Sequence, residues 1–174
     1  AWVRDDTQGI GTMTYLDLNG HFGALGRGIS DSDTGGVVEI QDGALYETQI
    51  LGIERGDPGT PGVMSGVIYY GPGSLLGQID ANTETGIFGT AGENLRSRVA
   101  GEPIPIGYRQ DVKIGPALLR SSVSGTVKDY QIEIRKVDQS SSHRTKSIVF
   151  EVTDPALLDL TGGVIQGMSG SPII

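Results

Sequence analysis

The chain has 174 residues, with 13 Lys+Arg against 21 Asp+Glu and a formal net charge of −8. An acidic chain without a run of basic residues lacks the attraction to phosphate that supplies most nucleic-acid affinity, which argues against DNA or RNA as a partner. No stretch approaches the roughly 18 apolar residues of a membrane-spanning helix. Zero cysteines exclude disulfides and thiol catalysis, and two histidines argue against a His-rich zinc site. We therefore expect no transmembrane segment, metal or cofactor.

The first predicted element is a hairpin over Gly11–Gly28, in which Asn19-Gly20 separates two alternating runs. An Asn-Gly pair between such runs is a strong hairpin signal because both positions of the turn need φ > 0. The 28 glycines, about 16% of the chain where ~7% is usual, argue against a mostly helical protein. Further strands are predicted at Val37–Ile40, Leu45–Ile53, Val63–Tyr70, Ser74–Asp80, Gly86–Gly89, Gln131–Val137 and Ser147–Val152.

Only two short segments have helical character. Gly92–Val99 is ambiguous, whereas Asp154–Leu160 begins with an N-cap residue followed by Pro155 at the first helical position. The spacing of the strands, roughly 8–15 residues with glycine-rich turns, predicts an all-β sandwich or barrel.

One segment carries a pattern suited to nucleophilic catalysis, Gly167-Met168-Ser169-Gly170-Ser171-Pro172. Glycines on both sides of Ser169 let a substrate carbonyl approach, and the backbone N–H groups of Gly167 and Ser169 are placed to face a developing oxyanion. A serine alone is a weak nucleophile, so a base and a residue that orients it must come from elsewhere. From spacing alone, a plain Gly/Ser turn into a strand is the better explanation of the pattern.

The same segment resembles the nucleophile loop of chymotrypsin-like serine peptidases. With the longer run Gly163–Ile174 and the segment His21–Asp31, the chain more narrowly resembles the sporulation stage IV protein B (SpoIVB) peptidase family. The resemblance implies a chymotrypsin-like double β-barrel and one serine peptidase domain over residues 1–174. Family members carry an amino-terminal PDZ domain that this chain does not include. Ala1 in place of Met, and an end at Ile174 within an apolar run, indicate a piece of a longer polypeptide that also lacks a C-terminal tail.

By this resemblance Ser169 is the nucleophile and Asp154 the acid of a catalytic triad. The family's general-base histidine lies in a Gly-His-Gly-Ile-Ser-Asp motif, and this chain has Arg27 at that position, in the segment Gly26–Asp31. Arginine is always protonated and has no acceptor, so it cannot take the proton from Ser169. We therefore expect a serine endopeptidase domain inactivated at position 27, through an engineered or a natural change.

Asp154 has an alternative explanation, and the two histidines of the chain must be considered as alternative bases. Asp154 at a helix start satisfies free N–H groups without any catalytic role, although both roles can coexist, and as the acid it is expected to pair with Arg27. His21 lies six residues from Arg27, ~20 Å along an extended strand, and so cannot replace the base. His143 lies in a serine-rich loop and is expected to be solvated.

The resemblance also implies a biological setting. Family members act outside the cytoplasm, between the forespore and mother-cell membranes of a spore-forming bacterium. They cleave themselves and a membrane-bound regulator, which leads to the activation of a late sporulation sigma factor. Arg27 supports an alternative, a non-catalytic pseudopeptidase that acts as a binding or regulatory module. A plain structural β-domain ranks last, because it leaves the long motifs unexplained.

Overall fold

The computed structural model describes residues 8–31, 34–40, 42–99, 101–138 and 147–174. In these ranges the chain forms many strands and little helix, which confirms the predicted all-β class. The chain divides into two compact units. Unit 1 comprises Ala1–Gly52, Ser65–Glu102 and Gly167–Ser171, and unit 2 comprises Ile53–Met64, Pro103–Gln166 and Pro172–Ile174. That residues 1–174 form one peptidase domain stays a prediction.

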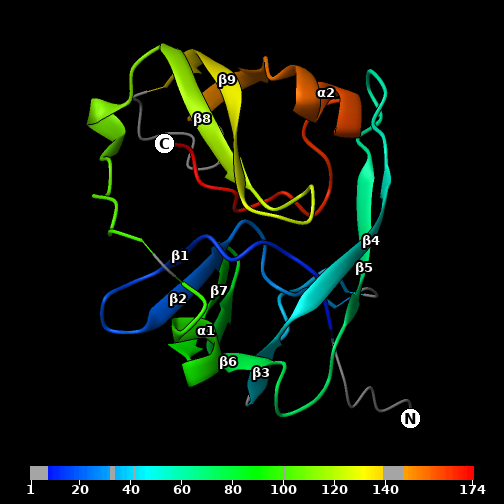
Figure 1. Ribbon diagram of the computed structural model, residues 1–174, viewed down its shortest axis with the longest axis vertical. Helices are drawn as coiled ribbons and strands as arrows, with labels where there is room; N and C mark the ends of the chain where they lie inside the picture. Colours follow the sequence, from blue (N-terminus) through cyan, green and yellow to red (C-terminus); the bar gives the residue numbers. More distant parts are fainter. Residues whose placement is uncertain (1–7, 32–33, 41, 100, 139–146) are drawn as a thin grey trace. The chain divides into compact units, whose positions relative to one another are not determined.

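Unit 1 is built on an antiparallel sheet with the strand order β1-β2-β7-β6-β3 (Figure 1). Its core includes Phe22 and Ile79 from the sheet, and Leu95 from a short helix that packs against β6 and β7. Phe22 is only 1% exposed, so its ring contributes roughly 1.5–3 kcal/mol by burial. The elements are β1 (Tyr15–Leu16), β2 (His21–Leu25), β3 (Gly43–Tyr46), β6 (Leu75–Thr83), β7 (Gly86–Ala91) and α1 (Glu93–Arg96).

The predicted first hairpin is present as β1 and β2, but its turn differs from the prediction. The loop includes Asp17, whose N–H donates to the carbonyl of His21 and whose carbonyl accepts from the N–H of Gly20. Gly20 alone has a positive φ, +87°, and Asn19 does not. The Asp17 carboxylate accepts the N–H groups of Asn19 and His21, at 2.9 and 2.7 Å. These side-chain bonds stabilise a longer loop, so the two-residue turn was the wrong prediction.

A second pair of strands, β4 (Thr48–Glu54) and β5 (Val63–Ile68), forms a two-stranded sheet. The single strand predicted over Leu45–Ile53 is therefore wrong, because the chain is interrupted at Glu47. The N–H of Glu47 donates to the carbonyl of Ser74 at 2.9 Å, and its carbonyl accepts from the N–H of Tyr69 at 3.0 Å. The chain thus leaves its pairing with β6 and begins its pairing with β5 at this residue.

The strand predicted over Val37–Ile40 is also absent. Val37 forms only an isolated bridge with Ser30, and the N–H of Val38 donates to the carbonyl of Ile29 at 2.9 Å. This short apolar run therefore pairs locally with the Ile29–Ser30 segment instead of joining the sheet of unit 1.

Unit 2 contains a three-stranded antiparallel sheet in the order β10-β9-β8 (Figure 1). Ile132 and Ile134 alternate on β9 and are at most 5% exposed, as the period-two pattern predicted, and Tyr130, just before the predicted strand, is also buried. Strand β8 was not predicted, because Pro116 lies near its start and proline weakens a strand pattern. The elements are η1 (Arg109–Asp111, a single 3-10 turn), β8 (Gly115–Ser121), β9 (Lys128–Val137), β10 (Ile148–Val152) and α2 (Pro155–Thr161).

The last residues of the chain extend this sheet. Leu118 and Ile174 exchange two backbone hydrogen bonds of 2.8 Å each, and the N–H of Arg120 donates to the carbonyl of Pro172. The outer edge of β8 is therefore paired. None of the three sheets closes into a barrel over the part of the chain that the structure describes. Within the same ranges, no helix has the length and apolar character needed to cross a membrane.

Candidate functional site

The candidate nucleophile Ser169 lies in a tight turn at the surface of unit 1. Gly167 and Gly170, on either side of it, have φ values of +103° and +89°. The N–H of Ser171 donates to the carbonyl of Met168 at 3.0 Å, and the Met168 side chain is buried. Ser169 itself is exposed. The turn therefore fixes its backbone by burying the preceding side chain, while it presents the serine to solvent.

The Ser169 turn packs directly against the end of β2. Gly26 has a φ of +131°, and a Cβ built on it would lie 3.0 Å from the Cβ of Ser169. A Cβ at Gly170 would collide with the carbonyl oxygen of Leu25. Both glycines are therefore required for the close approach of the two backbones. Arg27 follows Gly26, about 3.8 Å further along the Cα trace, so this contact brings position 27 into the neighbourhood of Ser169.

A second set of contacts, which the sequence did not reveal, also fastens the turn. The hydroxyl of Thr12 donates to the carbonyl of Gly167 at 2.8 Å in a half-buried position. The hydroxyl of Thr14 accepts the N–H of Leu25 at 2.9 Å. Thr12 and Thr14 therefore hold the serine turn and the end of β2 together, although more than 150 residues separate Thr12 from Gly167 in sequence. Two threonines ahead of a hairpin carry no sequence signal of this role.

The backbone N–H groups expected to form the oxyanion hole are available as donors. Neither the N–H of Gly167 nor that of Ser169 donates to any residue that the structure describes. The carbonyl of Gln166 accepts the N–H of Met64 at 3.0 Å, which fixes the orientation of the Gln166–Gly167 peptide. Because a trans peptide holds its C=O and N–H in opposite directions, the N–H of Gly167 points away from Met64. The N–H of Ser169 and that of Gly167, two residues earlier, are therefore free to donate, and their role as an oxyanion hole stays a prediction.

Arg27, at the position of the family's base, has an exposed side chain. It forms no hydrogen bond or ion pair with the described residues. The backbone that follows it is held tightly: a Cβ at Gly28 would collide with the carbonyl oxygen of Thr83 in β6. The backbone next to Arg27 is therefore held in place at Gly28, while the Arg27 guanidinium is exposed to solvent.

Asp154 lies in unit 2, where it caps α2 as the sequence predicted. Its Oδ1 accepts the N–H groups of Ala156 and Leu157, at 2.9 and 3.2 Å. Its Oδ2 accepts the N–H of Gln131 in β9 at 3.1 Å, a contact that the sequence did not indicate. The bond from Gln131, followed by those from Leu157 and Ala156, lowers the pKa of the Asp154 carboxyl below its ordinary value. The carboxylate is therefore kept ionised, and its pairing with Arg27 stays a prediction.

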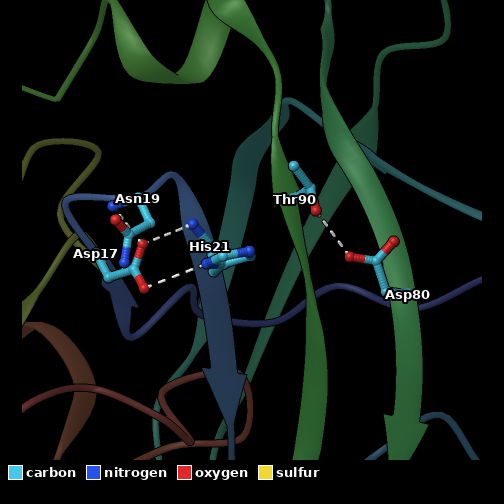
Figure 2. Close-up of polar contacts among 5 residues, drawn as sticks. All are labelled: Asp17, Asn19, His21, Asp80 and Thr90. Atoms are coloured by element: carbon cyan, nitrogen blue, oxygen red, sulfur yellow. Dashed lines mark hydrogen bonds and ion pairs between the residues drawn. The ribbon is translucent and has the colours of Figure 1, made fainter.

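His21 lies at the start of β2 and contacts a carboxylate of its own (Figure 2). Its Nδ1 is 3.4 Å from Oδ2 of Asp17, and its N–H bond to the same carboxylate is the main reason why the pKa of Asp17 is lowered. Along β2, His21 is about 16 Å from Gly26 at roughly 3.3 Å per residue, so it does not reach the serine turn. A separate hydrogen bond joins Thr90 to Asp80 at 2.8 Å (Figure 2). His143 lies outside the described residues.

A groove of about 780 Å³ in unit 1 contains none of the candidate residues. It is lined by parts of β3, β6, β7 and α1, with Asp42 and Glu93 as its acidic residues. Among the described residues no group of three or more His, Cys, Asp or Glu side chains is placed to hold a metal ion. Among the described residues, the groove therefore contains neither a candidate catalytic residue nor a cluster of metal ligands.

The family model described as SpoIVB peptidase S55 matches residues 1–174, the whole chain. The chain is therefore a serine peptidase domain of the SpoIVB type. It belongs to the SpoIVB peptidase S55 family, which confirms the resemblance found in the sequence. The searches of curated proteins and of solved structures give no match to the chain. Family membership implies protein substrates and a protease connected with sporulation.

Proposed function

We propose that the chain is the peptidase domain of a sporulation signalling protease, with Ser169 as nucleophile and position 27 as the site of its general base. The observation that carries this proposal is the packing of Gly26 on Ser169, with a built Cβ 3.0 Å from the serine Cβ. It supports a base at the next residue, within the same unit. The free N–H groups of Gly167 and Ser169 supply the oxyanion hole.

The chemistry follows from these roles when an imidazole occupies position 27. The imidazole takes the proton of the Ser169 hydroxyl while Oγ attacks the scissile carbonyl carbon, and the oxyanion receives hydrogen bonds from Gly167 and Ser169. The proton then passes to the leaving amine, the C–N bond breaks, and an acyl-enzyme remains that water hydrolyses. Asp154, the proposed acid, retains acceptor capacity because a carboxylate offers about four lone-pair sites and three N–H groups contact it here.

Arg27 removes the first of these steps, since a guanidinium has donors but no acceptor. The chain as it stands is therefore an inactive peptidase domain. Loss of one triad member costs up to ~10⁶-fold in turnover, while an oxyanion hole alone retains roughly 10³–10⁴ over water. Arg27 also ends any self-cleavage by this domain.

The substrates and location follow from the family resemblance. We propose that the active form acts outside the cytoplasm, between the forespore and mother-cell membranes. There it cleaves itself and the exposed part of a membrane-bound regulator, which leads to sigma-factor activation. By the family resemblance, we also propose an association of this peptidase domain with a PDZ domain.

The test is covalent labelling with a fluorophosphonate, in which Oγ of an activated serine displaces fluoride from phosphorus. The chain and its Arg27→His variant are incubated with the probe, and the intact mass is measured; Arg27→His with Ser169→Ala is the matched control. We expect one adduct on Arg27→His and none on the other two. Absence of an adduct on Arg27→His, with the fold retained by circular dichroism, overturns the proposed base position.

A second candidate function is a non-catalytic binding or regulatory module. The exposed Arg27 side chain, without a partner among the described residues, favours it. Sequencing of the parent gene separates the two: a histidine codon at position 27 marks an inactivated enzyme, and an arginine codon supports the module.

A further inference from the structure

A single asparagine from β6 holds the segment that follows position 27. Oδ1 of Asn82 accepts the N–H of Ile29 at 2.8 Å. Its Nδ2 donates to the carbonyl of Ile29 at 2.8 Å and to the carbonyl of Val38 at 2.9 Å. Both amide hydrogens and the amide oxygen are therefore used in half-buried bonds to backbone atoms. Only this orientation of the amide satisfies one N–H group and two carbonyls at once.

These bonds fix the backbone beside position 27 rather than a distant loop. Asn82 takes both the N–H and the C=O of Ile29, two residues after Arg27, so the peptide planes on each side of Ile29 are defined. Gly28, between Arg27 and Ile29, packs on the backbone of Thr83 so closely that no Cβ fits. On the other side of Arg27, Gly26 packs on Ser169. Arg27 is thus held between an anchor on β6 and a contact with the nucleophile turn.

Besides its bonds to Ile29, the Asn82 side chain bonds only to the carbonyl of Val38, among the described residues. Asparagine is depleted in strands, because it does not pack well on a sheet and competes for backbone hydrogen bonds. Thr83, its neighbour in β6, has a side chain that bonds locally, to the carbonyl of Gly86. The contacts of Asn82 instead span 53 and 44 residues and meet in one place, the segment after position 27.

We propose that Asn82 is a positioning residue that sets the backbone of position 27 so that a base there faces Ser169. This inference rests on the proposed function of position 27. Geometry of this kind matters because a misplacement of about 1 Å costs up to ~10²-fold in rate. Asn82 acts through the Ile29 backbone and does not itself contact the reacting atoms.

The test compares two asparagines in the Arg27→His chain. Asn82→Ala removes the anchor. Asn94→Ala is the matched control, because Nδ2 of Asn94 also donates to backbone carbonyls of unit 1, those of Pro72, Gly73 and Leu75, away from the serine turn. Fluorophosphonate labelling is measured over a range of probe concentrations, to separate the maximal rate from the half-saturating concentration. Thermal midpoints of both variants are measured alongside.

We expect Asn82→Ala to lower the maximal labelling rate about 10- to 100-fold, with an unchanged half-saturating concentration. Asn94→Ala is expected to label within about 3-fold of its parent. Equal labelling by Asn82→Ala and its parent overturns the inference while the proposed function stands, and so does an equal loss in Asn94→Ala. If the Arg27→His parent is not labelled, the proposed function fails instead. Amide hydrogen exchange at Ile29 then decides the anchor: about 10-fold faster exchange in Asn82→Ala is expected, and unchanged exchange overturns it.

Discussion

The candidate catalytic residues of unit 1 and the candidate acid of unit 2 are held in position by different kinds of contact. Position 27 and Ser169 lie in unit 1. They are fixed by the backbone packing at Gly26 and by long-range side-chain hydrogen bonds from Thr12 and Asn82. Asp154 lies in unit 2 and is fixed mainly by bonds to its own helix, at Ala156 and Leu157. The contacts in unit 1 serve mainly to bring the segment around position 27 and the Ser169 turn together. The contacts of Asp154 serve a helix whether or not catalysis occurs.

This difference shows which roles a variant can separate. At Asp154 a change to asparagine keeps the helix cap at Oδ1, but it removes the negative charge and the acceptor for the N–H of Gln131. In the serine turn, structure and proposed activity depend on the same backbone approach, so a change there affects both. The following predictions use that distinction.

The largest effect is expected from Asp154→Asn in the Arg27→His chain. Asparagine is as good an N-cap as aspartate, so the helix stays formed. It cannot stabilise an imidazolium, and replacement of a triad aspartate by asparagine lowers turnover by about 10⁴-fold. We expect fluorophosphonate labelling to fall by a factor of this order, with a stability loss of about 1 kcal/mol from the missing Gln131 bond.

Asp154→Ala is the companion variant, because it removes the cap as well as the charge. It is expected to lose labelling equally and to lose about 1 kcal/mol of stability in addition. Labelling of Asp154→Asn at the parental rate would show that Asp154 only caps α2.

Gly170→Ala tests the close approach of the serine turn to β2. Its φ of +89° costs an alanine about 1–2 kcal/mol, and the new Cβ would also collide with the carbonyl of Leu25. Gly125 has the same φ, +89°, but no atom within 4 Å of a built Cβ, so Gly125→Ala measures the backbone strain alone. We expect urea denaturation to show a loss of about 3 kcal/mol or more for Gly170→Ala and about 1 kcal/mol for Gly125→Ala. Equal losses would mean that the two segments are not in close contact.

The lowered pKa of Asp154 gives a stability that depends on pH. Because the folded-state pKa lies below the unfolded one, near 3.9, the contribution is fully present above about pH 4–5 and is lost as pH falls through the folded pKa. The stability difference between the parent and Asp154→Ala should therefore be largest near neutral pH and shrink in acid. Urea midpoints of both chains between about pH 3 and pH 7 provide the measurement. A difference that grows on acidification contradicts the assignment.

Local patterns in the sequence predicted much of the fold, and tertiary contacts account for what they missed. The period-two pattern of Ile132 and Ile134 identified β9, and Asp154-Pro155 identified the start of α2. The interruption at Glu47 was not predictable, since its backbone bonds go to two segments that are distant in sequence.

The same limit applies to the candidate site. Motif resemblance selected Ser169 and position 27, because glycine-flanked motifs are local. Asn82 and Thr12 have no motif, and their contacts with Ile29 and Gly167 exist only in the folded chain. Asn82 lies just beyond the strand predicted over Ser74–Asp80, so no strand pattern drew attention to it.

Thr12→Val tests the bond that fastens the nucleophile turn. Valine has nearly the same shape but no hydroxyl, so the half-buried carbonyl of Gly167 loses its donor, at a cost of about 1–3 kcal/mol. Thr12→Ser keeps the hydroxyl and is expected to lose less than half as much. Urea denaturation of the three chains measures these differences. Equal losses for valine and serine would assign the effect to the methyl group rather than to the hydrogen bond.

Ser171→Ala is expected to have the smallest effect, and for the opposite reason. The hydroxyl oxygen of Ser171 is buried and has no hydrogen-bond partner among the described residues. Removal of an unsatisfied polar atom relieves its desolvation penalty, so alanine should be neutral or more stable by up to about 1 kcal/mol. Thr12→Val removes a hydroxyl that bonds to the nucleophile turn and Ser171→Ala removes one at the end of that turn, with opposite expected signs. A loss of more than about 1 kcal/mol in Ser171→Ala would reveal a partner for this hydroxyl and place another bond within the nucleophile turn.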